Sequence, residues 1–361
     1  MPKRLAYDRP LFATTLALLT FGLVMVFSAS ALTAAEQSGS PYSFVARQAV
    51  GALIGLAALV GLMRLDYRKL REPAVVYSLL CLTVFLLGAV FFLDRSHNTH
   101  RWVRLGPLSL QPSEMAKPTL ILFLAYYLET RLKTLNEWAT LGPVLVYLGL
   151  ICALVVAEPD LGTTVALALI ATAMLFAVGL RWRLLGAGAA ASVPLLYLLI
   201  FSVPYRRERI LAFLHPWKDA RGAAFQIVQS LIALGSGGLS GVGLMNGRQK
   251  LFFLPEAHTD FIFAVVGEEF GWIGCALVVA GFVVILWRGM RIARRAPDVF
   301  GRLLAVGVTS MIVIQALINF SVVTSLVPNK GIPLPFISYG GSSLIFSLAA
   351  AGILLSISEQ T

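Results

Sequence analysis

Long apolar runs separated by short polar segments dominate the pattern of this 361-residue chain. Most of the runs approach the roughly 20 residues that an α-helix needs to cross the hydrocarbon core of a bilayer. The pattern predicts an all-α integral membrane protein in which residues 1–361 form one polytopic domain of ten transmembrane helices. The predicted spans cover residues 11–32, 47–64, 74–93, 113–129, 140–157, 162–180, 184–203, 261–287, 302–327 and 337–356.

The longest polar segment, residues 204–260, separates the seventh and eighth predicted spans. Apolar and polar positions between Phe225 and Leu234 are spaced as in an amphipathic helix that lies at a membrane interface. A glycine-rich run follows at residues 235–243, but it matches no known phosphate-binding fingerprint. The pattern therefore predicts a large loop with partial helical structure outside the bilayer.

Composition agrees with a membrane location. Hydrophobic residues make up 58% of the chain and charged residues only 13%, against about 25% charged residues in average soluble domains. Cys81, Cys152 and Cys275 all lie inside apolar runs, so we interpret them as buried hydrophobic residues and not as disulfide or metal partners. The run that begins at Leu11 lacks the features of a removed signal peptide and is predicted to be a membrane helix.

The basic residues indicate which side of the membrane each loop occupies. Short loops such as 64–71 and 288–302 are rich in Lys and Arg, so the positive-inside rule places them and both termini in the cytoplasm. The outer segment 204–260 nevertheless contains seven basic and four acidic residues. This excess of positive charge is explained either by contact with lipid headgroups or by an anionic ligand such as a pyrophosphate.

Several carboxylates lie at or inside the predicted membrane boundary, where charge is costly to maintain. Asp260 opens the eighth span and is a candidate general base. Asp160 lies between two spans and is either a helix cap or a second active-site carboxylate. Glu268 and Glu269 lie about 12 Å further along the helix from Asp260, so they must pair, be protonated or face a polar cavity.

Glu114 and Lys117 are three residues apart and share one face of the predicted fourth span. We interpret them as a structural ion pair. The histidines do not show the spacing of metal ligands, so no dedicated metal site is predicted. All four lie in predicted outer segments: His97, His100, His215 and His258.

Five short motifs follow one another along the chain: Arg101-Trp102, Gln111-Pro112-Ser113-Glu114, Pro159-Asp160-Leu161-Gly162-Thr163, His258-Thr259-Asp260-Phe261 and Ile337-Ser338-Tyr339-Gly340-Gly341-Ser342-Ser343. In this order they resemble the signatures of the SEDS glycosyltransferases, the shape, elongation, division and sporulation family. This resemblance implies a ten-helix polymerase that joins lipid II into peptidoglycan strands on the outer face of the bacterial cytoplasmic membrane. It also implies that Asp260 is the essential aspartate, that Asp160 is the second one, and that Glu114 and Lys117 are the family's salt-bridge pair.

The resemblance and the outer cations together suggest a substrate-binding set. The expected partners are lipid II, the lipid-linked glycan, membrane lipids and a class B penicillin-binding protein, with no nucleic acid. No cofactor is required, although a divalent cation, Mg²⁺ or Mn²⁺, is compatible with a pyrophosphate leaving group. The predicted substrate-binding residues are Arg101, Arg206, Arg209, Lys250, His258, Lys330 and Ser338.

Within the family, Arg248-Gln249-Lys250 ahead of Leu254-Pro255-Glu256-Ala257-His258 resembles the division branch, FtsW, or its sporulation relative. The short terminal segments fit the elongation branch, RodA, equally well. Two other functions remain open, a lipid II transporter and a non-catalytic scaffold for the penicillin-binding protein. Transport predicts polar residues spread through both leaflets, whereas here they gather on the outer side, which favours catalysis.

Overall fold

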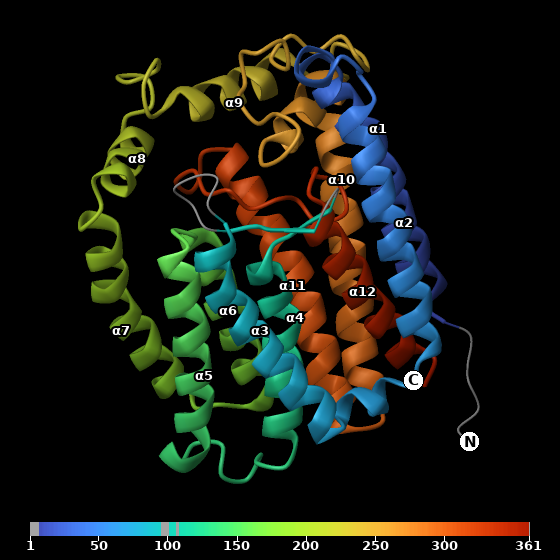
Figure 1. The fold of residues 1–361 in the computed structure, drawn as a ribbon, viewed down its shortest axis with the longest axis vertical. Helices are drawn as coiled ribbons and strands as arrows, with labels where there is room; N and C mark the ends of the chain where they lie inside the picture. Colours follow the sequence, from blue (N-terminus) through green and yellow to red (C-terminus); the bar gives the residue numbers. More distant parts are fainter. Residues whose placement is uncertain (1–6, 95–100, 106–107, 361) are drawn as a thin grey trace.

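The computed structural model describes residues 7–94, 101–105 and 108–360. Helices form nearly all of this part of the chain, and the longest of them lie side by side in one bundle (Figure 1). The helices are α1 (Arg9–Ser38), α2 (Ser43–Arg64), η1 (Tyr67–Arg71), α3 (Pro73–Leu93), α4 (Pro112–Glu129), α5 (Trp138–Ala157), α6 (Leu161–Val178), α7 (Trp182–Phe201), α8 (Pro204–Leu214), α9 (Phe225–Ser236), α10 (Ile262–Arg295), α11 (Val299–Val323) and α12 (Gly341–Ser358).

Nine of the helices in the described residues are long and apolar enough to cross a membrane, so the prediction of a multi-pass helical membrane protein is confirmed. The remaining predicted span, residues 113–129, corresponds to α4, which is 18 residues long but carries three charged residues, Glu114, Lys117 and Glu129. Its side chains are nevertheless mostly buried against neighbouring helices. A tenth crossing by α4 stays a prediction.

A short antiparallel hairpin, which the sequence pattern did not predict, precedes α4. Its strands are β1 (Val103–Leu105) and β2 (Leu108–Leu110), with Val103 opposite Leu110. The hairpin is fixed to the start of α12, where Ser342 Oγ donates to the carbonyl of Ser109 at 2.7 Å. Two strands of three residues are too short to leave an alternating pattern distinguishable from the apolar runs around them.

The centre of the bundle is α11, which packs against α4, α6, α10 and α12. The most extensive helix contact joins α12 to α2, where a Cβ on Gly352 would lie 2.5 Å from the carbonyl oxygen of Leu59. Small residues let helix backbones approach this closely inside a membrane. By contrast, α7 has no buried residue and lies at the edge of the molecule (Figure 1).

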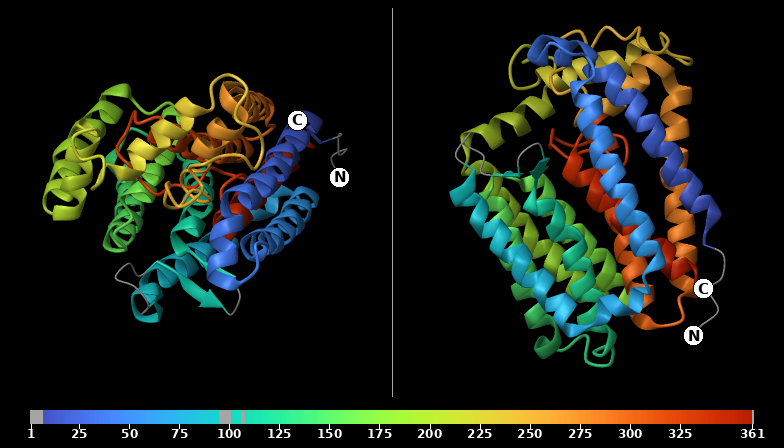
Figure 2. Two further views of the ribbon diagram at one scale, coloured as in Figure 1. Left: turned by 90° about the horizontal axis from the view of Figure 1, so that it is seen from above. Right: turned by 45° about the vertical axis from the view of Figure 1, so that its right-hand side comes forward.

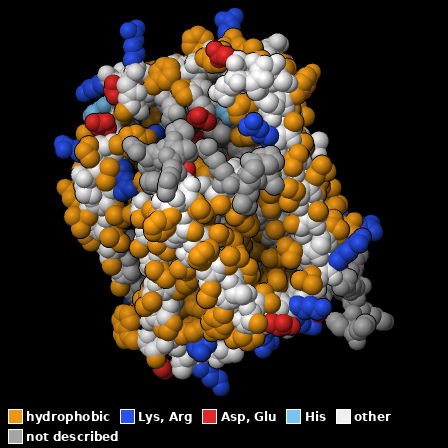
Figure 3. All heavy atoms as spheres, viewed as in Figure 1, with side chains coloured by type: hydrophobic (Ala, Val, Ile, Leu, Met, Phe, Trp, Pro, Cys, Tyr) orange, Lys and Arg blue, Asp and Glu red, His pale blue; other side chains and the backbone are white. Residues whose placement is uncertain are grey.

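The start of α1 and the end of α12 lie at one end of the bundle (Figure 1). There the amide of Asp8 donates to Ser358 Oγ at 3.1 Å, and Arg288 forms an ion pair with the Asp8 carboxylate. The opposite end is covered by α9 and the loop that follows it, as the view from above in Figure 2 shows. Charged side chains gather towards the two ends, and hydrophobic side chains cover most of the surface between them (Figure 3).

The predicted span 261–287 is broken at Gly271, where φ is +63° and ψ is −159°. The loop at residues 238–243 inserts at the break and pairs with the backbone groups that the helix leaves free. A Cβ on Gly271 would lie 2.5 Å from the amide nitrogen of Gly241, so only glycine fits this close approach. Four backbone hydrogen bonds result, each given from the donating amide to the accepting carbonyl: Val242 to Glu268 (3.0 Å), Gly243 to Glu269 (3.0 Å), Trp272 to Gly238 (3.0 Å) and Ile273 to Leu239 (3.2 Å).

Candidate active site around Asp260

Asp260 ends the loop after α9, two residues before α10 begins, and its side chain is partly exposed. Asn319 of α11 donates its side-chain amide to the Asp260 carbonyl at 2.8 Å and to the Ile332 carbonyl at 2.9 Å. The carboxylate lies against Gly331, where a Cβ would be 2.8 Å from Asp260 Oδ2. Asn319 therefore joins the aspartate to the proline-containing segment between α11 and α12.

The surroundings of Asp260 raise the pKa of its carboxyl to about 7. Burial is the main cause, followed by the negative charges of Glu256 and Asp160, while Arg209 and Arg101 oppose the shift. These interactions bring together charges from α8, the α9–α10 loop, the start of α6 and the segment before β1. A carboxyl that titrates near neutral pH is suited to general-base catalysis.

Asp160 caps the N-terminus of α6. Its Oδ1 accepts from the Thr163 amide at 3.0 Å and its Oδ2 accepts from the Thr163 hydroxyl at 2.8 Å. Both carboxylate oxygens are thus used within the cap, and the side chain is 5% exposed. Ile332 packs on Gly162 in the same helical turn, with 3.1 Å between Ile332 Cγ1 and a Cβ built on Gly162. Gly331 and Ile332 therefore contact the surroundings of both predicted aspartates.

Arg101 holds the turn between α5 and α6. Its guanidinium donates to the carbonyls of Glu158 at 2.8 Å and Pro159 at 2.6 Å. Pro159 has a φ of +31°, so this turn is strained. Arg101 thus fixes the position of the Asp160 cap, and its charge also acts on Asp260.

Glu158 is a feature that the sequence analysis missed. Its side chain is fully buried, and neither carboxylate oxygen has a hydrogen-bond partner in the described residues. Burial and the nearby charge of Asp160 raise the pKa of this carboxyl to about 8, while Arg101 opposes the shift. The sequence signal that could have indicated this buried carboxyl is a pair of acids separated by one proline at a helix junction.

Three of the predicted substrate-binding cations, Arg206, Arg209 and Lys330, lie near one another and near Asp160. Burial lowers the pKa of Lys330, the positive charges of Arg206 and Arg209 lower it further, and Asp160 opposes them. Arg206 donates to the Leu199 carbonyl at 2.9 Å. Arg209 lies over the ring of Tyr205, with 4.4 Å from its guanidinium carbon to the ring centroid. Within the described residues none of the three cations forms an ion pair, so their charge remains available for an anionic ligand.

His258 and Ser338, also predicted to bind substrate, are buried in contacts with the protein itself. The His258 ring packs edge-on against Phe44, with 4.8 Å between ring centroids, and lies 5.5 Å from the ring of Tyr339. Ser338 Oγ donates to the Thr259 carbonyl at 2.6 Å. Both residues therefore hold the loop that ends at Asp260.

Lys250, also predicted to bind substrate, lies in a buried ion pair in the structure. Its ammonium group lies 2.5 Å from Glu269 Oε1 and 2.9 Å from Ser28 Oγ, and the residue is only 6% exposed. The prediction relied on the excess of basic residues along segment 204–260. It missed this pairing because Glu269 lies beyond a helix break and Ser28 on the first helix.

The predicted ion pair on α4 is present in the structure. Lys117 Nζ lies 2.6 Å from Glu114 Oε1, and the two residues are 2% and 3% exposed. Because both charges are buried, removal of either partner would leave the other uncompensated. Of the other histidines, His215 is exposed at the end of α8, and His97 and His100 lie outside the described residues.

No metal site is formed by the described residues, because they contain no group of three or more His, Cys, Asp or Glu side chains able to hold an ion. The Asp160 oxygens are also already used by Thr163. The residues present therefore do not fit a cation held by the protein alone.

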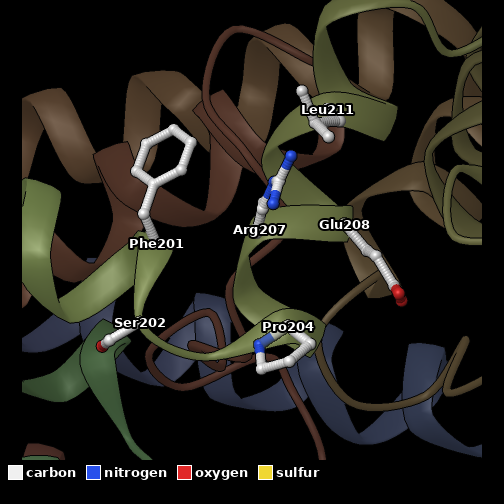
Figure 4. Close-up of a pocket in the computed structure, with 6 residues that line it drawn as sticks. All are labelled: Phe201, Ser202, Pro204, Arg207, Glu208 and Leu211. Carbon is white, nitrogen blue, oxygen red and sulfur yellow. The ribbon is translucent and has the colours of Figure 1, made fainter.

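A pocket of about 290 Å³ lies at the corner between α7 and α8 (Figure 4). Arg207 points between Phe201 and Leu211, while Glu208 points away in another direction. The predicted site residues do not line this pocket, which is formed by Phe201, Ser202, Pro204, Arg207, Glu208 and Leu211.

The family model of the cell cycle proteins FtsW, RodA and SpoVE matches the chain over residues 9–361. The chain belongs to the FtsW/RodA/SpoVE family. The predicted family is thus confirmed.

Curated relatives of the chain come from two branches of the family. The probable peptidoglycan glycosyltransferase FtsW of Geobacter metallireducens is 45% identical over 98% of this chain and 95% of its own length. The stage V sporulation protein E of Bacillus subtilis is 42% identical over 99% of both chains. These likenesses agree with the predicted resemblance to the division and sporulation branches.

Solved structures share the fold. A chain from a peptidoglycan synthase complex that coordinates polymerization and crosslinking superposes with a TM-score of 0.80, at 30% identity over 98% of both chains. The rod shape determining protein RodA of Thermus thermophilus superposes with a TM-score of 0.69, at 28% identity over 99% of this chain and 98% of that one.

Proposed function

We propose that this protein is a peptidoglycan glycosyltransferase that joins the disaccharides of lipid II into glycan strands and releases undecaprenyl pyrophosphate. Family membership and the curated names of its relatives support the activity. The observation that carries the mechanism is Asp260, a partly exposed carboxyl with a pKa of about 7 beside a group of cations that form no ion pair in the described chain.

In this mechanism Asp260 takes the proton from the C4 hydroxyl of the acceptor's N-acetylglucosamine. The hydroxyl oxygen attacks the anomeric carbon of the lipid-linked donor, and the bond to the pyrophosphate breaks as the configuration inverts from α to β. A positioned general base contributes about 10²–10⁴-fold to such a step. The raised pKa lets Asp260 accept the proton at neutral pH and release it again after the reaction.

Arg206, Arg209 and Lys330 are proposed to bind the pyrophosphate groups. Burial is the main cause of the lowered pKa of Lys330, and the repulsion from Arg206 and Arg209 that adds to it is relieved when an anion binds between them. The same cations offset the charge that develops on the leaving group. Since the side chains of the described residues form no group of three or more His, Cys, Asp or Glu able to hold a cation, no step is assigned to a divalent metal.

Asp160 and Arg101 are proposed to support this site. Asp160 fixes the start of α6 and contributes to the raised pKa of Asp260, and Arg101 holds the preceding turn. We therefore expect Asp160→Asn to have a milder effect than loss of Asp260.

We also propose the orientation and partner of the enzyme. The end that carries Asp260 faces outward from the cytoplasmic membrane and the termini lie in the cytoplasm, in agreement with the basic short loops. A class B penicillin-binding protein would crosslink the product, and the structural similarity to a chain of a peptidoglycan synthase complex supports this pairing.

The test is glycan formation from lipid II by the purified protein, alone and with a class B penicillin-binding protein, in detergent and in liposomes. A polymerase yields a ladder of glycan lengths. A transporter would move labelled lipid II between leaflets without forming polymer, and a scaffold would do neither. Failure to form polymer in the presence of the partner would contradict the proposal.

A further inference from the structure

A second charged group lies on the other side of the loop that ends at Asp260. Lys250 contacts the carboxylate of Glu269 at 2.5 Å and the hydroxyl of Ser28 at 2.9 Å. The Ser28 hydroxyl in turn donates to Glu269 Oε1 at 2.7 Å. We call Lys250, Glu269 and Ser28 the anchoring cluster. Its members are 6%, 1% and 3% exposed, so it is closed to a large ligand.

The neighbouring carboxylate, Glu268, strengthens this connection. It accepts from the backbone amides of Arg248 at 2.8 Å and Gln249 at 3.2 Å. The two adjacent glutamates of α10 therefore hold three consecutive loop residues, 248–250, through one ion pair and two backbone amides. Charge-assisted hydrogen bonds of this kind are the stronger ones in proteins.

The anchoring cluster closes a ring of the chain that contains Asp260. The loop leaves Lys250, reaches Asp260 midway along the sequence, and returns through the first helical turns of α10 to Glu269. Those turns form a separate piece, because Gly271 breaks the helix directly after Phe270. The orientation of this piece, and of Asp260 before it, therefore depends on contacts at both of its ends.

The end of the piece near Asp260 is held by Asn319 and by the Ser338 contact with Thr259. The far end is held by the anchoring cluster and by the backbone hydrogen bonds that the loop at residues 238–243 forms at the helix break. The first piece of α10 contains the nine residues from Ile262 to Phe270, so at 1.5 Å per residue Asp260 lies roughly 13 Å from Glu269. A small rotation at the far end thus moves the carboxylate at the near end.

We propose that the anchoring cluster positions Asp260 for catalysis, so that Lys250, Glu269 and Ser28 are positioning residues and not substrate ligands. This inference rests on the proposed function of Asp260. It assigns Ser28, on the first helix of the chain, a role in the placement of the base. It also explains why a lysine in a cation-rich outer loop is buried.

The test uses conservative variants of the full-length protein. Lys250→Met and Glu269→Gln remove one charge each while they preserve approximate side-chain size. The matched control is Arg248→Ala, which removes an exposed cation two residues from Lys250 but leaves the backbone amide that Glu268 binds. A charge-swapped double variant, Lys250→Glu with Glu269→Lys, asks whether the two residues act as a pair.

For Lys250→Met and Glu269→Gln we expect kcat to fall roughly 10–100-fold with KM for lipid II changed by less than about 3-fold, because a misplacement near 1 Å costs about 10²-fold. The acid limb of the kcat profile should also move to lower pH, because a loosened Asp260 becomes better solvated. A merely structural role would lower the amount of active enzyme without moving this limb. The Arg248→Ala variant should retain the kcat and the acid limb of the wild type. The charge-swapped double variant should have a higher kcat than either single variant.

Hydrogen–deuterium exchange supplies a readout that does not depend on activity. Loss of the anchoring cluster should speed exchange across residues 251–261 and leave α8 unchanged. A rise in KM with kcat, acid limb and exchange all unchanged would instead make Lys250 a substrate ligand and overturn the inference. An inactive wild type would refute the proposed function, and unchanged exchange in both charge variants would separately refute the anchoring role.

Discussion

The two halves of the segment between α7 and α10 both carry basic residues, yet they differ in how they are held. Residues 204–224 carry five of the seven basic residues of the segment, and only Ala212 of α8 is buried. Residues 237–261 follow α9 and are fixed by backbone pairing at the α10 break and by the anchoring cluster. In the first half, Arg206 and Arg209 form no ion pair in the described chain, whereas in the second half Lys250 is buried and paired.

This difference shows that a basic residue in an outer loop has its role set by the carboxylates that the fold places opposite it. Lys250 meets Glu269, which cannot remain buried and charged without a partner. Arg209 contacts an aromatic ring and retains its full charge for a ligand. We infer that the anchored half holds the base and that the exposed half binds the anionic part of the substrate. The following changes test that division, from the largest expected effect to the smallest.

The largest effect on stability is expected for Glu269→Ala. It leaves the buried Lys250 ammonium without its carboxylate, and loss of one member of a buried pair typically costs about 3–5 kcal/mol. Thermal unfolding in detergent, compared with wild type at equal lipid content, measures the change. Stability within about 0.5 kcal/mol of wild type would mean that water or another group compensates Lys250.

The second effect concerns Glu158, which lies outside both halves but next to Asp160. Because the pKa of its buried carboxyl is raised to about 8, the folded protein retains a proton that the unfolded chain loses above pH 4–5. Wild-type stability should therefore fall as pH rises through this window and level off above pH 8. Glu158→Gln has no such proton to lose, so its stability relative to wild type should increase over the same range, on the order of a few kcal/mol. If the difference in free energy of unfolding between Glu158→Gln and wild type stayed constant between pH 5 and pH 8.5, that result would contradict the raised pKa of Glu158.

A smaller effect, confined to the exposed half, is expected for Arg206→Ala and Arg209→Ala. Each removes a charge-assisted contact to pyrophosphate, so kcat/KM for lipid II should fall roughly 10-fold for each change, since such contacts contribute about 1.5–3 kcal/mol. Thermal stability should be almost unchanged because both side chains are partly exposed. If a variant with both changes kept the wild-type kcat/KM, these arginines would not be part of the substrate site.

The smallest effect is expected for Glu208→Ala, the counterpart of Glu269→Ala in the exposed half. Glu208 is exposed on α8, and surface charges typically contribute less than about 1 kcal/mol. Unfolding temperature and kcat/KM should both match wild type. A loss of stability as large as that of Glu269→Ala would erase the distinction between the two halves.

Much of the fold could be predicted from the sequence because helix formation in a membrane leaves a local signature. The apolar runs gave ten helical segments in the right order, and the Glu114–Lys117 spacing gave a pair that the structure contains. The position of Asp160 before a helix likewise indicated its cap. Each of these features depends on residues within one or two helical turns.

Features that depend on tertiary contacts were missed. Nothing local to Lys250 indicates that a break at Gly271 and a hydroxyl on α1 will surround it. The isolated burial of Glu158 likewise follows from how α5 and α6 pack, and the pattern of the chain does not contain that information. His258 and Ser338 carry polar groups that the family motifs associate with the site, whereas their packing shows that they support the loop.

The central claim is that Asp260 is the base, and Asp260→Asn tests it most directly. The variant removes the proton acceptor with almost no change in side-chain shape. Thermal unfolding and hydrogen exchange can check that the variant folds like the wild type. Polymerisation of lipid II by the purified variant, measured beside wild type at pH 7.5, should fall about 10²–10⁴-fold. A well-folded Asp260→Asn protein that polymerises lipid II at the wild-type rate would contradict the account.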